Sequence, residues 1–182
     1  MGLSCFRDPV LSGTRRGLFS LVLCARIPDM KAELRRPRLQ DAPAIQRLIN
    51  SFADQGEMLP RSLSEVYENL RDYLIAEEDG ELVGCCALHV MWEDLAEVKS
   101  LAVREDHRRT GIGQQLVRAC LEEARTLGVP RVFLLTYIPD FFRRFGFCQV
   151  EKAGLPQKVW MECVRCPRFP DCGEVGMVLD LE

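Results

Sequence analysis

The chain has 182 residues, of which 47% are hydrophobic and 28% are charged, and its formal net charge is −3. This length and composition are typical of one folded domain with a sizeable core. The charge gives no basic field for nucleic acid, and no apolar run approaches the roughly 20 residues that cross a bilayer. We therefore expect neither nucleic acid nor a membrane among its partners.

The hydrophobic patterns typical of strands and helices start only after Met30. The apolar run from Leu18 to Ala25 is too short for a signal peptide, and no small-residue cleavage site follows it. We expect a disordered or spurious extension over residues 1–29 and a single domain over residues 30–182.

Taken in chain order, the patterns of this domain predict an α/β fold, a mixed sheet with helices on both faces. Asp41 can cap the first helix, Ser62 and Glu65 form a capping box for the second, and Asp79-Gly80 is a strong hairpin signal. The expected elements are a strand over 32–36, a helix over 41–53, a helix after Ser62, strands over 73–78, 82–90 and 95–103, a helix over 112–127, a strand over 132–136, a helix over 140–145, a strand from 146 and a strand over 175–181.

The most informative stretch is Arg108-Arg109-Thr110-Gly111-Ile112-Gly113, which joins a strand to a helix. At such a turn the first helical N–H groups point outward, the helix dipole favours negative charge, and glycine lets a phosphate approach the backbone. The stretch lacks the Gly-Lys-Ser/Thr of a P-loop and the three glycines of the dinucleotide fingerprint. Two interpretations follow from these residues: a diphosphate cradle, or an ordinary turn with surface arginines.

This loop, the order of elements and the segment Phe141-Phe142-Arg143-Arg144-Phe145-Gly146-Phe147 resemble the GCN5-related N-acetyltransferases, or GNAT proteins. The resemblance covers residues 32–160 and implies a mixed, mostly antiparallel central sheet with acetyl-CoA as co-substrate. Two residues depart from the family pattern. Thr110 replaces the usual Arg, Lys or Gln, and Phe142 stands where many relatives carry a tyrosine that protonates the leaving thiol.

Five phrases are further similar to the acetyltransferase domain of N-acetylglutamate synthases, above all the short bacterial form. This resemblance implies an amino-acid N-acetyltransferase that acetylates the α-amino group of L-glutamate by direct transfer, the first step of arginine biosynthesis. The phrases are Met58-Leu59-Pro60-Arg61-Ser62, Gly84-Cys85-Cys86-Ala87-Leu88, Ala96-Glu97-Val98-Lys99-Ser100-Leu101-Ala102-Val103, Phe133-Leu134-Leu135-Thr136 and Leu155-Pro156-Gln157-Lys158.

The resemblance also implies which residues hold the coenzyme. The strand before the loop pairs with the pantetheine arm, and the loop amides hold the diphosphate with help from two arginine side chains. Backbone N–H groups at a distorted strand end near Leu101 are expected to stabilise the oxyanion. The expected coenzyme-binding residues are Leu101, Ala102, Val103, Arg108, Arg109, Thr110, Gly111, Ile112, Gly113 and Gln114.

Two residues are candidates for proton transfer. Glu97 stands where the fold often carries a catalytic glutamate, and its apolar neighbours favour a raised pKa that suits a base near neutral pH. Tyr137, at a strand end, is the nearest substitute for the missing tyrosine acid, and solvent water is the alternative. The plainer interpretations are a solvent-facing glutamate and a packing tyrosine.

The two carboxylates of glutamate call for cationic partners. We expect Arg61, in the loop before the capped helix, to bind the acceptor. Lys99 projects from the strand of Glu97 on the same face, and Lys158 follows Leu155-Pro156 in a late loop. Each is also compatible with a plain surface cation, and for Arg61 we favour the binding role.

The nine cysteines show no paired disulfide framework, which favours a reducing cytoplasm. Cys163-x-x-Cys166 with Cys172 has the first spacing of a zinc knuckle, but only three thiols are present, so we expect no metal. His89 lies on an apolar strand and is expected in the core. The cysteines also expected in the core are Cys85, Cys86 and Cys120.

Two other functions stay open. One keeps the chemistry and changes the acceptor to glutamine, another small amine or a protein N-terminus. The other is a non-catalytic acyl-CoA sensor, which keeps the cradle and needs no base. A homodimer formed through sheet edges also stays open, although no element of the sequence requires it.

Overall fold

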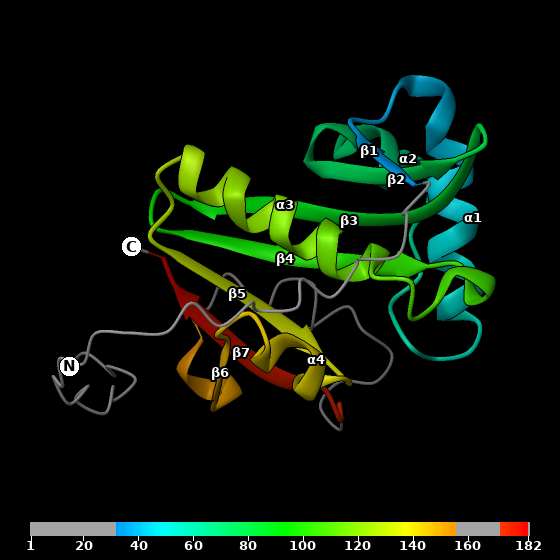
Figure 1. The fold of residues 1–182 in the computed structure, drawn as a ribbon. Helices are drawn as coiled ribbons and strands as arrows, with labels where there is room; N and C mark the ends of the chain where they lie inside the picture. Colours follow the sequence, from blue (N-terminus) through cyan, green and yellow to red (C-terminus); the bar gives the residue numbers. More distant parts are fainter. Residues whose placement is uncertain (1–31, 156–171, 182) are drawn as a thin grey trace, which may run out of the picture.

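The computed structural model describes residues 32–155 and 172–181 (Figure 1). These residues form a seven-stranded sheet with the order β1-β2-β3-β4-β5-β7-β6. Neighbouring strands are antiparallel except β4 and β5, so the mixed, mostly antiparallel fold is confirmed. The strands are β1 (Glu33–Arg35), β2 (Tyr73–Glu78), β3 (Glu81–Trp92), β4 (Leu95–Val103), β5 (Arg131–Thr136), β6 (Cys148–Val150) and β7 (Val175–Asp180).

The helices begin and end close to the predicted positions. The capping box of the second helix is confirmed, because Ser62 Oγ accepts the N–H of Glu65 at 3.2 Å and the Ser62 N–H donates to Glu65 Oε2 at 2.7 Å. Within the described residues, none of the helices is long and apolar enough to cross a bilayer. The helices are α1 (Ala42–Ala53), α2 (Leu63–Glu68), α3 (Ile112–Thr126) and α4 (Pro139–Arg143), with 3-10 turns η1 (Leu39–Asp41), η2 (Leu70–Asp72), η3 (Glu105–His107) and η4 (Lys152–Gly154).

The cap predicted at Asp41 is wrong. Its side chain makes no capping hydrogen bond to α1. It accepts the backbone N–H of Arg38 at 2.6 Å and pairs with the guanidinium of Arg35 at 2.7 Å. Since Arg35 also contacts Glu77 at 2.5 Å, the carboxylate of Asp41 ties the start of α1 to β1 and β2 instead of closing the helix end.

Helices cover both faces of the sheet, as predicted. Cys86 and Leu88 of β3 pack in the core beneath α3, which lies in front of β3 and β4 in Figure 1. Cys85 and Ala87, on the opposite face of the same strand, pack in a second core with α1 and α2. Cys120 of α3 is also fully buried, so the three cysteines expected in the core are there. Burial raises the pKa of the Cys85 thiol to about 12 and keeps it protonated.

A glycine in β3 sets the distance between the sheet and the start of α3. A Cβ atom at Gly84 would lie 3.1 Å from both Ile112 Cγ2 and Leu116 Cδ1, which is tighter than most real contacts. The first turn of α3 therefore rests directly on β3. This contact fixes where the N-terminus of α3, and the loop before it, lie relative to β4.

Candidate functional site

A one-residue bulge interrupts β4 at Ser100, whose φ is +53°. Val98 packs beneath α3, and regular alternation would send Leu101 to the other face. Instead Leu101 packs against the α3 core and Ala102 lies in the core under α1. The extra residue therefore inverts the phase of the strand and distorts the backbone. The distortion expected near Leu101 is thus centred one residue earlier.

Beyond its first residues, β4 separates from β5. The two parallel strands pair only at Ala96 with Val132 and Glu97 with Phe133 within the described residues. Figure 1 shows them diverging from there toward the N-terminus of α3. The edge of β4 around the bulge therefore offers backbone groups to an extended ligand, in the manner of strand addition. This is the stretch for which we predicted pairing with a pantetheine arm.

The loop after β4 presents the first amides of α3. Arg109 and Gly111 adopt left-handed φ values of 68° and 95°. The first helical hydrogen bond runs from the Gln115 N–H to the Gly111 carbonyl at 3.1 Å. The amides of residues 111–114 thus precede the first donor of the helical ladder and mark the positive end of the helix dipole. This arrangement suits an anion.

Protein packing does not require a glycine at position 113. A Cβ atom on Gly113 would meet Val103 Cγ2 at 3.6 Å and Phe141 Cζ at 3.7 Å, which are ordinary contacts. Its φ also lies outside the left-handed region. The contact with Phe141 places α4 beside the start of α3. Alanine would therefore fit at position 113, so packing within the protein does not explain why this residue is glycine.

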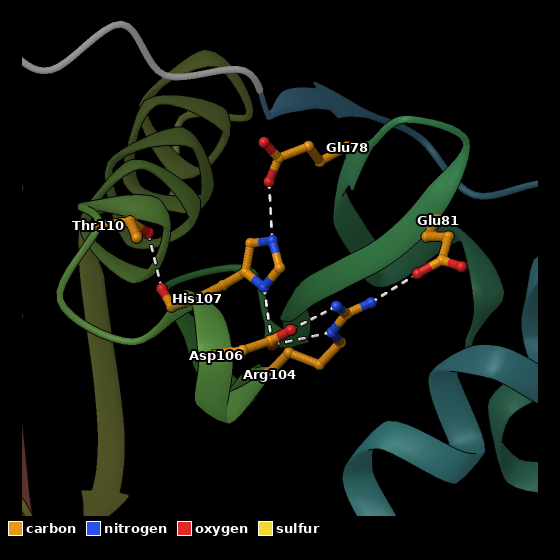
Figure 2. A network of polar contacts seen from close by, with 6 residues as sticks. All are labelled: Glu78, Glu81, Arg104, Asp106, His107 and Thr110. Carbon is orange, nitrogen blue, oxygen red and sulfur yellow. Dashed lines mark hydrogen bonds and ion pairs between the residues drawn. The ribbon is translucent and has the colours of Figure 1, made fainter.

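A polar network holds the segment before this loop against the β2–β3 hairpin (Figure 2). The His107 ring lies between Asp106 Oδ1, 2.8 Å from Nδ1, and Glu78 Oε2, 2.7 Å from Nε2. Asp106, with a smaller effect from Glu78, raises the pKa of His107 and favours the imidazolium. Arg104 adds a second link to the hairpin through Glu81 at 2.7 Å.

Two predicted loop side chains turn away from the helix N-terminus. The Arg108 guanidinium lies 5.0 Å from the centre of the Phe52 ring, and its Nη2 is 3.2 Å from Glu57 Oε2. The Thr110 hydroxyl donates to the His107 carbonyl at 2.6 Å and closes the turn. In this arrangement the polar groups at the start of α3 are its backbone amides and not the side chains of Arg108 and Thr110. Diphosphate binding by Arg108 stays a prediction.

Polar residues form a strip on the sheet face opposite α3. Glu97 and Lys99 project from this face of β4, with Lys99 Nζ 3.6 Å from Glu97 Oε2. Only 14% of the Glu97 side chain and 12% of the Lys99 side chain are exposed. The strip lies between the core under α1 and a third apolar cluster around Phe133 and Leu95. A nearly enclosed carboxylate beside an ammonium group can exchange a proton with a bound molecule.

His89 belongs to this strip, so its predicted place in the core is wrong. It lies on β3 directly opposite Glu97, and 31% of its side chain is exposed. Its Nδ1 is 2.5 Å from Oδ2 of Asp72, the last residue of η2. Apolar neighbours in sequence suggested burial, but this end of β3 extends beyond the area that α1 covers. Neither Asp72 nor His89 was predicted as a functional residue.

Arg61 approaches the same face from the loop before α2. Asn50 holds its backbone, accepting its N–H at 2.8 Å and donating to its carbonyl at 3.0 Å. The side chain of Arg61 is 14% exposed and lies close enough to Tyr73 for its charge to lower the pKa of that hydroxyl. Burial dominates and raises the pKa of Tyr73 to about 12, while a hydrogen bond joins Tyr73 to Ser100. Tyr73 thus contacts the bulge through Ser100, an interaction that no sequence pattern indicated.

The remaining candidates lie further away or outside the described residues. Tyr137 is 38% exposed, and its hydroxyl is 3.9 Å from Cys172 Sγ. It lies four positions after Phe133, the partner of Glu97, and just past the end of β5, which corresponds to about 13 Å of extended chain. Within residues 32–155 and 172–181, no three His, Cys, Asp or Glu side chains are grouped for a metal ion. Of the residues singled out in the sequence, those of the predicted extension, Lys158, Cys163 and Cys166 lie outside the described ranges.

The chain matches known proteins over most of its described length. The model of the family described as acetyltransferase (GNAT) matches residues 40–147. An uncharacterized N-acetyltransferase of Chlorobaculum tepidum is 41% identical over 155 residues, which cover 85% of this chain and 100% of the relative. An amino-acid acetyltransferase of Mycobacterium tuberculosis is 37% identical, with 75% of this chain and 80% of the relative covered.

Solved structures show the same architecture. A Mycobacterium tuberculosis protein in complex with CoA has a TM-score of 0.71 and 34% identity, over 82% of this chain and 99% of that one. The N-acetylglutamate synthase from Neisseria gonorrhoeae, complexed with coenzyme A and N-acetyl-glutamate, has a TM-score of 0.75 and 27% identity. That match covers 83% of this chain but only 35% of the longer synthase.

Proposed function

The chain belongs to the GNAT acetyltransferase family and is an acetyl-CoA-dependent N-acetyltransferase, and from this premise we propose that its acceptor is L-glutamate. The observation that carries the proposal is the enclosed ion pair of Glu97 with Lys99 on the sheet face opposite α3. A second enclosed cation, Arg61, comes from the loop before α2, where its guanidinium lies 3.9 Å from Glu65. A relative named amino-acid acetyltransferase and a similar structure holding N-acetyl-glutamate support the same acceptor class.

The coenzyme is proposed to span the bulge and the start of α3. The diphosphate sits on the amides of residues 109–114, and the pantetheine arm pairs with residues 101–103 along the free edge of β4. This placement explains Gly113, because a side chain there fits the protein but keeps a phosphate off the backbone. The thioester then lies near Ser100, where distorted backbone N–H groups can stabilise an oxyanion.

Glu97 is proposed as the base. It removes a proton from the acceptor ammonium, and the free amine attacks the thioester carbonyl. The tetrahedral intermediate collapses with release of CoA, whose thiolate takes a proton from Tyr137 or from water. Lys99, whose Nζ is 3.6 Å from Glu97 Oε2, attracts the carboxylates of glutamate together with Arg61. Lys158 is a further proposed partner for these carboxylates.

An acceptor screen tests the substrate. Free thiol release from acetyl-CoA is measured across the amino acids, small amines and a peptide with a free N-terminus. We expect glutamate to give the highest kcat/KM. Arg61→Ala should raise the KM for glutamate at least about 10-fold and leave the KM for acetyl-CoA within about two-fold, while Arg61→Lys should lie between, because lysine keeps the charge but loses the fork. Equal rates for glutamate and neutral amines would contradict the proposal.

Glu97→Gln separates an enzyme from an acyl-CoA sensor. The variant should bind acetyl-CoA like the wild type in calorimetry, while kcat falls about 100- to 10,000-fold because the base is gone. A sensor would bind acetyl-CoA and release no thiol in either form with any acceptor. In the proposed role, one domain over residues 30–182 makes N-acetylglutamate in the cytoplasm for arginine biosynthesis.

A further inference from the structure

An aspartate–histidine pair lies behind the proposed base. Asp72 and His89 come from different elements, η2 and β3, and their Oδ2 and Nδ1 atoms are 2.5 Å apart. The Asp72 side chain is 26% exposed and that of His89 is 31% exposed, so the pair reaches water without lying fully in it. A contact this short between two titratable side chains fixes the orientation of the imidazole.

The topology places His89 between two carboxylates. Strand β3 lies between β2 and β4, and His89 faces Asp72 on the β2 side. On the β4 side its register partner is Glu97. Side chains directly opposite each other on one face of an antiparallel pair have Cβ atoms about 4.5–5.5 Å apart. Among the described residues, the charged groups that face His89 are therefore Asp72 on one side and Glu97 with Lys99 on the other.

We propose that His89, oriented by Asp72, accepts the proton that Glu97 removes from the acceptor and passes it to solvent. The inference rests on the proposed role of Glu97 as base, but not on the identity of the acceptor. Because His89 acts through Glu97, it is a positioning residue for the base rather than a catalytic residue.

The proton balance of one turnover shows what the pair contributes. The ammonium gives one proton to the Glu97 carboxylate, and the resulting acid passes it to His89 Nε2, its register partner on β3, through a water between the two side chains. This transfer requires that Nδ1 carry its proton toward Asp72, which leaves the Nε2 lone pair as acceptor. The imidazolium then releases the proton to water. The amine forms the C–N bond, the C–S electrons leave on sulfur, and the second amine proton ends on the thiol.

Glu97 needs this route for its proton because its side chain is enclosed. Only 14% of its side chain is exposed, and bound substrate covers it further, so direct proton exchange with bulk water is restricted during turnover. A neighbouring imidazole that is in contact with solvent returns Glu97 to its working form.

The first test is the pH dependence of His89→Gln and Asp72→Asn, with the best acceptor from the screen. Near neutral pH we expect kcat to fall about 10- to 100-fold while the KM for acetyl-CoA changes less than about two-fold. The deficit should shrink as the pH approaches the pKa of the acceptor, since the amine then arrives without its extra proton. Added imidazole should restore part of the activity of His89→Ala and none of that of Glu97→Gln.

The second test needs no turnover. The chain has two histidines, so an imidazole nitrogen NMR spectrum of the wild type, compared with that of His89→Gln, assigns the His89 signals. We expect the neutral ring to carry its proton on Nδ1, and Asp72→Asn to shift this tautomer balance.

A proton on Nε2 in the wild type, or a rate loss equal at every pH, would overturn the relay. Wild type with no transfer to any acceptor would instead overturn the proposed function.

Discussion

Replacing Gly113 with alanine should change stability and coenzyme affinity in opposite directions. Gly113 is the second residue of α3, and the new methyl group meets Val103 and Phe141 at 3.6 and 3.7 Å, without a clash. Alanine restricts the unfolded chain more than glycine does, which stabilises a helical position by about 0.4–1 kcal/mol. In a domain of this size that raises Tm by about 1–4 °C.

The same methyl group occupies the space through which a phosphate approaches the loop amides. Loss of one charge-assisted hydrogen bond costs about 1.5–3 kcal/mol, which weakens binding about 10- to 150-fold. Calorimetric titration with acetyl-CoA and with its desulfo analogue measures this change, and thermal unfolding measures stability on the same samples. Both ligands should lose affinity equally, because both carry the same diphosphate.

Gly154→Ala is the matched control. Gly154 ends η4, its φ lies outside the left-handed region, and a Cβ atom there meets nothing within 4 Å. It should leave coenzyme affinity unchanged. If Gly113→Ala is folded and binds acetyl-CoA as tightly as the wild type, the diphosphate does not rest on the amides that open α3, and the cradle interpretation fails.

Three further predictions concern the frame around the site. Gly84→Ala should lower the free energy of unfolding by about 1–3 kcal/mol in urea, because its Cβ overpacks against the start of α3. Asp106, and to a smaller extent Glu78, raises the pKa of His107, so the charged imidazole stabilises the fold. This stabilisation is complete below pH 6.5, the ordinary pKa of histidine, and is lost as the pH rises through the raised pKa. The Tm deficit of His107→Gln should therefore be largest at mildly acid pH and vanish at alkaline pH. Arg35 lowers the pKa of Asp41, so the ion pair between them stabilises the fold. Its contribution is present above pH 3.8, the ordinary pKa of aspartate, and is lost as the pH falls through the lowered pKa. Asp41→Asn should cost about 1 kcal/mol at neutral pH and little in strong acid, and an equal loss at both would contradict the ion pair.

Local sequence signals predicted the elements well because each carries its own physical cause. Asp79 and Gly80 adopt the left-handed φ values of 51° and 82° that a tight hairpin requires. Ser62 and Glu65 satisfy each other's backbone N–H groups at the start of α2. The error at Asp41 has an equally physical origin. A charged partner from β1, six residues earlier in the chain, competes for the carboxylate that the helix end would otherwise bind.

The bulge could not be read from the sequence. Ser100 adopts a positive φ without being glycine, so no residue type marks the position. The phase change that it causes decides that Leu101 packs beneath α3 while Ala102 packs beneath α1. An uninterrupted alternating pattern gives the opposite faces for these residues. Pairing with β3 and contact with Tyr73 fix the distortion, and both partners are distant in sequence.

The sequence by itself determined the order of elements and the glycine turn that opens α3, because turns, caps and alternating faces are set by residues close together in the chain. Only the tertiary structure decided that Asp72 and His89 meet, that His89 lies opposite Glu97, and that Tyr73 contacts Ser100 at the bulge. Strand register and helix packing bring these side chains together, and both depend on the burial of distant apolar residues rather than on any local pattern.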